Sequence, residues 1–319
     1  MRAKRGSKPR VVIAGLGDSG LLTALHLSRH VEVVGVSAKP ALVSGQELGM
    51  RLARPDDWAR DYYVDFDRYR RLDRVRTVHA TLTGLSLEDR TVAVRHADGT
   101  TGTEPYDVLV VATGVANGFW RRPDLQTDIE ARAALRSNHD RLAAAGSINV
   151  IGGGAAAVST AANLSLVWPE KQVGLWYPRE QALPQHHRRT WQRVSGLLSQ
   201  RGVALHPGHR AVVPPGFGCD RITADPVVWS TGQPPALADA TIWAIGRVTP
   251  NTSWLPASLL DEDGFVRVAP DLSVVGATGV FAIGDVAATD PLRGSARNRA
   301  DRLLARNIRA HLAGRPLGD

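Results

Sequence analysis

Two glycine-rich segments carry the clearest chemistry in this sequence. The first, residues 15–20, reads Gly-Leu-Gly-Asp-Ser-Gly and follows the apolar run 11–14. The second, residues 152–157, reads Gly-Gly-Gly-Ala-Ala-Ala and follows the run 148–151. Glycines at this spacing let the backbone approach a pyrophosphate, and a helix that begins there points free N–H groups at the phosphates. Two such segments predict two dinucleotide ligands, and a protein that holds two usually passes electrons between them.

Each glycine segment needs a strand before it and a helix after it. The apolar pattern predicts strand, turn, helix and strand over residues 10–37. A second unit of this kind starts at residue 147, with its helix over 155–167, and further helices are predicted over 128–144 and 188–200. The fold class is therefore α/β, with two Rossmann-like dinucleotide-binding domains.

The remaining segments are less regular. Residues 38–73 are expected to be irregular, strands are expected at 227–229 and 265–268, and a last helix is expected over 295–312. An aromatic cluster within the irregular segment could line a ligand pocket or pack under a long loop. Its members are Trp58, Tyr62, Tyr63 and Phe66.

Composition excludes several other classes of protein. The only cysteine among the 319 residues is Cys219, which excludes an internal disulfide, a CxxC redox centre and a cysteine-based metal site. No apolar run is long enough for a transmembrane helix, and we expect a cytoplasmic protein. The net charge of +8 is spread along the chain, so we predict no nucleic-acid partner, although peripheral membrane contact stays open. No metal site is expected, because the histidine pairs lack further ligands.

The order of motifs along the chain carries a family resemblance. Ala112, Thr113 and Gly114 follow a buried strand, the second glycine segment comes next, and the stretches 244–251 and 278–285 follow it. This order resembles the two-dinucleotide-binding-domain flavoproteins, which are FAD- and NAD(P)-dependent pyridine nucleotide oxidoreductases. Within them it is most similar to type II NADH dehydrogenases and apoptosis-inducing-factor-like quinone reductases.

The resemblance implies a domain arrangement and a reaction. An FAD-binding domain would comprise residues 1–120 and 253–319, with an NAD(P)H-binding domain of residues 121–252 inserted into it. Hydride would pass from NADPH or NADH to FAD, and electrons would pass on to a small acceptor, first of all a quinone. A ferredoxin-type or biosynthetic tailoring flavin reductase is an alternative. A non-catalytic FAD/NAD(P)-binding protein, working as a redox sensor or an interaction protein, is another.

The resemblance also implies which residues bind the cofactors. In such families the first glycine segment holds the pyrophosphate of FAD, the second holds that of NAD(P)H, and the carboxylate of the closing Gly-Asp pair bonds a ribityl hydroxyl. No side chain is expected to act as a catalytic acid or base. The expected cofactor-binding residues are Gly15, Gly17, Asp18, Ser19, Gly20, Ser37, Lys39, Leu82, Ala112, Thr113, Gly114, Gly152, Gly154, Ala155, Ala156, Ala157, Arg179, Gly246, Gly284 and Asp285.

Three departures from the family pattern stand out. Ser37 takes the place of the acidic residue that would bond the FAD ribose, so weaker FAD binding or another ligand is expected. Ser159 and Asn163 stand where type II dehydrogenases carry acidic residues. The segment 43–45 has no redox cysteine, which leaves electron transfer to the flavin alone.

The sequence leaves the choice between NADPH and NADH open. The second strand of the second unit runs into Tyr177, Pro178 and Arg179. An acid there would bond the 2′-hydroxyl of NADH, whereas an arginine suits the 2′-phosphate of NADPH. Further basic residues at 186–189 could add phosphate contacts or could form a solvated helix start.

Overall fold

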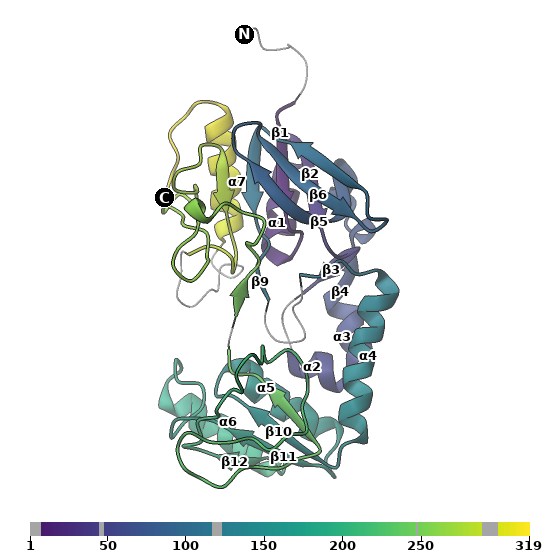
Figure 1. Ribbon diagram of the computed structural model, residues 1–319, viewed down its shortest axis with the longest axis vertical. Coiled ribbons are helices and arrows are strands. Elements are labelled where there is room, and N and C mark those ends of the chain that lie inside the picture. Colours follow the sequence, from purple (N-terminus) through teal and green to yellow (C-terminus); the bar gives the residue numbers. More distant parts are fainter. Residues whose placement is uncertain (1–7, 45–47, 117–122, 247, 289–298) are drawn as a thin grey trace.

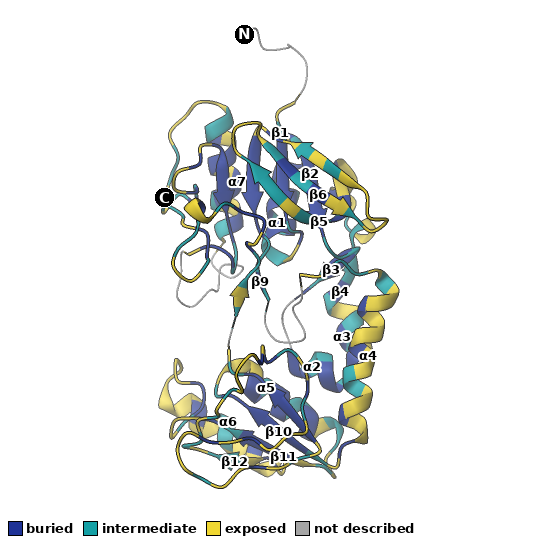
Figure 2. Ribbon diagram, viewed as in Figure 1, coloured by how far each residue is buried: buried dark blue, intermediate teal, exposed yellow. Residues whose placement is uncertain are grey.

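The computed structural model describes residues 8–44, 48–116, 123–246, 248–288 and 299–319. Two lobes each hold one main sheet, and the long helix α4 (Asp128–Ala144) runs from one lobe to the other (Figure 1). The strands at the centre of both lobes are buried, whereas the outer side of α4 is exposed (Figure 2). The chain therefore forms two α/β units around a shared middle region.

The sheet of the first lobe has seven strands in the order β15-β8-β1-β2-β5-β6-β7. Five are parallel, and β6 and β7 extend the sheet in antiparallel fashion. Their bounds are β1 (Arg10–Ala14), β2 (Glu32–Ser37), β5 (Val75–Ser86), β6 (Thr91–His96), β7 (Thr101–Pro105), β8 (Val108–Val111) and β15 (Val280–Ala282). Helices α1 (Asp18–Leu27) and α7 (Ala300–Leu312) pack against each other in this lobe. The expected strand, turn, helix and strand over 10–37 are confirmed.

The sheet of the second lobe has four parallel strands in the order β12-β11-β10-β13. They are β10 (Ser147–Ile151), β11 (Gln172–Trp176), β12 (Ala204–His206) and β13 (Ala240–Trp243). Helices α5 (Ala155–Val167) and α6 (Arg188–Gln200) follow β10 and β11, and both have the predicted bounds. The sheet lies within residues 121–252, but the domain boundaries as such stay a prediction, and the first, between residues 120 and 121, lies outside the described residues.

The segment 38–73 is more regular than the sequence analysis predicts. It forms β3 (Ala41–Val43), α2 (Leu48–Ala53), α3 (Pro55–Tyr62), β4 (Tyr63–Asp65) and the 3-10 turns Phe66–Arg68 and Arg70–Arg74. Helix α2 packs on α5, and its residues Leu48, Leu52 and Ala53 belong to the core of the second lobe. These elements escaped prediction because they are short and are stabilised mainly by tertiary contacts.

The strands expected at 227–229 and 265–268 are wrong. These segments form only isolated bridges, such as Trp229 with Ala211 and Val266 with Leu260. Prolines at 214, 215, 226, 234 and 235 surround the first of them. The backbone nitrogen of a proline cannot donate a hydrogen bond to a neighbouring strand, so the segment around residues 227–229 stays irregular.

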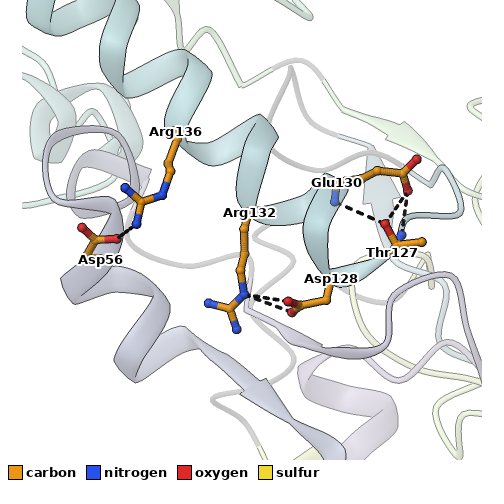
Figure 3. Close-up of polar contacts among 6 residues, drawn as sticks. All are labelled: Asp56, Thr127, Asp128, Glu130, Arg132 and Arg136. Atoms are coloured by element: carbon orange, nitrogen blue, oxygen red, sulfur yellow. Dashed lines mark hydrogen bonds and ion pairs between the residues drawn. The ribbon is translucent and has the colours of Figure 1, made fainter.

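Helix α4 is fastened at its N-terminus. The Thr127 hydroxyl accepts a hydrogen bond from the Glu130 N–H at 3.2 Å, and the Glu130 carboxylate accepts one from the Thr127 N–H at 2.8 Å (Figure 3). Arg136 donates to Asp56 at the start of α3, at 2.7 Å. The helix is thus capped and tied to the first lobe. In the described part of the chain, no helix is long and apolar enough to cross a bilayer.

Candidate functional site

The first glycine turn connects β1 to α1. Gly15 has φ +104°, and a Cβ there would lie 2.4 Å from the Ala112 carbonyl oxygen. A Cβ on Gly20 would lie 1.9 Å from the Gly15 oxygen, so this glycine serves the packing of helix on turn. In front of Gly17, by contrast, no atom lies within 4 Å of a built Cβ. The open space before Gly17 and the free N–H groups of α1 fit a pyrophosphate.

The second glycine turn repeats this construction between β10 and α5. Gly152 has φ +143°, and a Cβ there would lie 2.1 Å from the Ala244 oxygen. Ala157 is fully buried beneath the turn. No atom lies within 4 Å of a Cβ built on Gly154, which precedes the first residue of α5. The second turn therefore offers a phosphate the same approach as the first.

One cavity of about 1190 Å³ is lined from both lobes. Most of the expected residues of the first unit contribute to its wall, and Ala155, Gln185 and Arg221 reach it from the second lobe. The expected residues in the wall are Gly15, Gly17, Asp18, Ser19, Ser37, Lys39, Leu82, Ala112, Thr113, Gly114, Ala155, Gly284 and Asp285. Those outside its wall are Gly20, Gly152, Gly154, Ala156, Ala157, Arg179 and Gly246. The cavity is large enough for a dinucleotide and reaches from the first glycine turn to Ala155, the first residue of α5.

Two short segments far apart in the chain lie side by side in the cavity wall. Strand β9 (Val115–Ala116) pairs with β14 (Thr249–Pro250) in antiparallel fashion. Beside them, the Thr113 hydroxyl donates to the Asn251 carbonyl at 2.8 Å, and the Asn251 amide donates to the Thr113 carbonyl at 2.9 Å. Asn251 also lines the cavity, and the sequence analysis missed it as a site residue although it closes the 244–251 motif. Gly284, with φ +84°, and Asp285 also line the cavity.

Another part of the cavity wall lies at the carboxyl end of β2. The Ser37 hydroxyl accepts a hydrogen bond from the Lys39 N–H at 3.1 Å. The Lys39 ammonium donates to the Asp124 carbonyl and to the Gln126 side chain, each at 2.5 Å. The Gln126 carbonyl in turn lies 3.0 Å from His79 Nε2. Segment 123–126 thus covers this end, and its residues carry no local pattern by which sequence reasoning could find them.

Charges around the cavity are balanced. Four side chains in its wall are basic and four are acidic: Lys39, Arg51, Arg95, Arg221, Asp18, Asp124, Asp220 and Asp285. The carboxylate of Asp18 stands at the start of α1 and accepts a hydrogen bond from Ser44 at 3.3 Å. Burial, together with the negative charge of Asp18, raises the pKa of Tyr69. Asp18 therefore places a negative charge beside the open glycine turn.

In the second lobe, the carboxyl end of β11 lacks an acid. Gly152 N–H bonds the Trp176 carbonyl just as Gly15 N–H bonds the Val36 carbonyl, so Tyr177 matches Ser37 and Arg179 matches Lys39. Tyr177 is buried, and Arg179 is exposed. Trp176 stacks on His206 with centroids 3.6 Å apart, and burial and the neighbouring His209 lower the pKa of His206.

The family departures have structural partners. Arg54, between α2 and α3, donates to the side chain of Asn163 at 3.0 Å, so the position where an acid was expected joins α5 to this connection. Trp58 is fully buried in a packing cluster, and of the four aromatic residues only Tyr63 lines the cavity.

Cys219 is buried and does not line the cavity. Among the described residues, no three His, Cys, Asp or Glu side chains gather as metal ligands.

Comparison with known proteins gives a family match over nearly the whole chain. The model of the family described as pyridine nucleotide-disulphide oxidoreductase matches residues 9–307. Oxidoreductase phnG of Penicillium herquei is 30% identical over 317 residues, covering 88% of this chain and 75% of that protein. Type II NADH:quinone oxidoreductase Ndh of Mycobacterium tuberculosis is 24% identical over 352 residues, covering 96% of this chain and 73% of that protein.

A solved structure shares the fold. The crystal structure of reduced Bacillus anthracis CoADR-RHD superposes with a TM-score of 0.74 at 20% identity. The alignment covers 97% of this chain and 58% of that one, so this chain spans little more than half of the length of that protein. The expected arrangement of two Rossmann-like FAD/NAD(P)-binding units is confirmed at the level of the fold.

Proposed function

This chain belongs to the pyridine nucleotide-disulphide oxidoreductase family, and from this we propose that it passes electrons from NAD(P)H through flavin to a small quinone. The family is FAD-dependent and uses NAD(P)H. The observation that best supports the proposal is a cavity lined by both lobes, since hydride transfer requires two ligands whose reactive ends meet. When bound, FAD would accept the hydride and release the electrons one or two at a time.

The side chains and backbone of this chain would bind and orient the ligands. The N–H groups at the start of α1 and α5 would hold the two pyrophosphates, and Gly17 and Gly154 would leave room for them. Asp285 would bond a hydroxyl near the flavin end, as the family resemblance implies. The mutual hydrogen bonds of Thr113 and Asn251 hold the segments at β9 and β14 together in the wall of the cavity.

We favour NADPH over NADH as the electron donor. The matched position at the end of β11 is Tyr177, so no carboxylate stands there to bond a ribose 2′-hydroxyl. Arg179 follows two residues later, is exposed and makes no side-chain hydrogen bond or ion pair with the described residues. An arginine at this place can bond a 2′-phosphate through two N–H groups.

A quinone is our preferred acceptor for two reasons. One relative is by name a type II NADH:quinone oxidoreductase. The chain has a single, buried cysteine, so electrons cannot leave through a dithiol. The overall reaction would be NADPH + H⁺ + quinone → NADP⁺ + quinol. Ser159 and Asn163 offer no carboxylate, so we assign proton delivery to water rather than to a side chain.

An anaerobic spectrum tests the proposal. The purified chain, supplied with FAD, should lose its absorbance near 450 nm on addition of NADPH and regain it with menadione. Reoxidation by a ferredoxin that weakens with salt, with menadione inactive, would replace the quinone by a redox protein, a partner that the net charge of +8 could attract. A protein that binds both cofactors without bleaching would refute the enzymatic proposal.

A further inference from the structure

The ribose end of the first dinucleotide site lacks the carboxylate that such a site ordinarily uses. Strand β2 ends at Ser37, directly beside the glycine turn, since the Gly15 N–H donates to the carbonyl of Val36. An Asp or Glu at this place accepts hydrogen bonds from ribose hydroxyls. A serine hydroxyl can make one neutral hydrogen bond instead of charge-assisted ones, and charged hydrogen bonds are roughly twice as strong.

Among the described cavity-wall residues around Ser37, Asp124 carries a carboxylate, and it belongs to segment 123–126 rather than to β2. One lone pair of the Ser37 hydroxyl is already used by the Lys39 N–H at 3.1 Å. The Lys39 ammonium is held by the Asp124 carbonyl and by Gln126, and it donates only. His79, which faces Ser37 across the β2–β5 pair, lies 3.0 Å from the Gln126 carbonyl. The residues at this end therefore bond chiefly to one another.

A second feature lowers the affinity for a pyrophosphate. Asp18 is the first residue of α1 and lines the cavity next to the open space at Gly17. Its carboxylate competes with the phosphates for the positive end of the helix and repels them. Burial and, after it, the same negative charge raise the pKa of Tyr69. Both the ribose end and the phosphate cradle thus differ from a site built for tight retention of FAD.

We propose that this chain holds FAD as an exchangeable ligand, and that reduced FAD leaves the site as a product. This inference rests on the first half of the proposed function, the reduction of bound flavin by NADPH, and it moves the oxidation of the flavin by a quinone outside the cavity. The balanced step is NADPH + H⁺ + FAD → NADP⁺ + FADH₂, with the hydride and one proton ending on the flavin. The released FADH₂ would be consumed by an oxidation outside this cavity, in which a quinone, dioxygen or a second flavin-using protein accepts two electrons.

Equilibrium binding of FAD to the full chain, measured by quenching of FAD fluorescence, tests the proposal without turnover. The wild-type chain should release FAD on dialysis and bind it again with a micromolar dissociation constant. The variant Ser37→Asp restores a carboxylate and should lower that constant about tenfold, the ratio expected between charged and neutral hydrogen bonds. Asp18→Asn keeps the size of the side chain and should lower it several-fold.

Matched variants separate these effects from general charge changes. Ser199→Asp, on the exposed side of α6, and Asp263→Asn, in an exposed turn, should leave the dissociation constant unchanged. The proposal is overturned if the wild-type chain retains one FAD through dialysis with nanomolar affinity, or if Ser37→Asp has no effect. It is also overturned if Asp124→Asn weakens FAD binding tenfold or more, since Asp124 would then supply the missing carboxylate from segment 123–126.

Turnover separates this inference from the proposed function. With NADPH in excess and no oxygen, catalytic amounts of the wild-type chain should bleach a hundredfold excess of FAD, and reduced flavin should pass an ultrafiltration membrane. If flavin bleaches but stays with the protein, exchange is refuted while the NADPH oxidation stands. If no flavin bleaches although FAD binds, the proposed function fails.

Discussion

The contact between α2 and α5 permits a quantitative prediction. A Cβ on Gly49 would lie 2.4 Å from the carbonyl oxygen of Ser159 and 2.8 Å from the Cα of Thr160. Both contacts are with backbone, so Gly49→Ala must push α2 about 1 Å away from α5 to reach an ordinary separation. Overpacking of this kind costs about 1–3 kcal/mol. The gain in helix propensity returns about 1 kcal/mol, which leaves a net loss of up to about 2 kcal/mol.

The assay is thermal unfolding followed by circular dichroism. A loss of this size should lower Tm by up to about 3 °C for a chain of this length. Gly196→Ala is a matched control, because Gly196 lies in α6 and no atom stands within 4 Å of a Cβ built there. That variant should gain about 0.5–1 kcal/mol. If Gly49→Ala were as stable as Gly196→Ala, the close packing of α2 on the second lobe would be refuted.

Three further predictions test other parts of the molecule. Gly154→Ala should lower the free energy of unfolding by no more than about 1 kcal/mol, the effect of a changed N-cap. The same variant should raise the KM for NADPH at least about tenfold and leave bound FAD unchanged. An unaltered KM would show that no phosphate approaches this turn. Because burial and His209 lower the pKa of His206, the unfolded chain takes up the proton first, so the urea midpoint should fall as pH drops below about 6.5. His206→Phe should reduce that slope, and an identical slope would contradict the assignment. Thr127→Ala removes the capping box of α4 and should cost about 1 kcal/mol in urea unfolding; Ser137→Ala, exposed on the same helix, should cost less than about 0.5 kcal/mol, and equal costs would refute the cap.

Several elements could be predicted from the sequence because their signals are local. Helices α4, α5 and α6 have the bounds that the sequence predicts, since each is marked by an apolar pattern with a recognisable start or end. The two glycine turns could be predicted because only glycine fits there: a Cβ on Gly15 or Gly152 would collide with the backbone. The family assignment rests on the order of these local motifs, and the family match confirms it.

Other parts of the site depend on residues far apart in the chain. Lys39 is hydrogen-bonded to segment 123–126, which lies more than 80 positions later in the sequence. Thr113 is hydrogen-bonded to Asn251, which lies 138 positions later. Nothing in the spacing of either pair along the chain predicts such a meeting, because the hydrophobic period of a helix or strand reports only on neighbours a few residues away.

The sequence by itself determined that this protein has two glycine turns, each between a strand and a helix, and that it lacks a redox-active cysteine pair. Only the tertiary structure decided that one cavity reaches from the first glycine turn to the start of α5, that α2 joins the core of the second lobe, and how segment 123–126 covers the carboxyl end of β2. The physical reason is that local sequence fixes backbone conformation and amphipathic faces, whereas the meeting of those faces is chosen by packing over the whole chain.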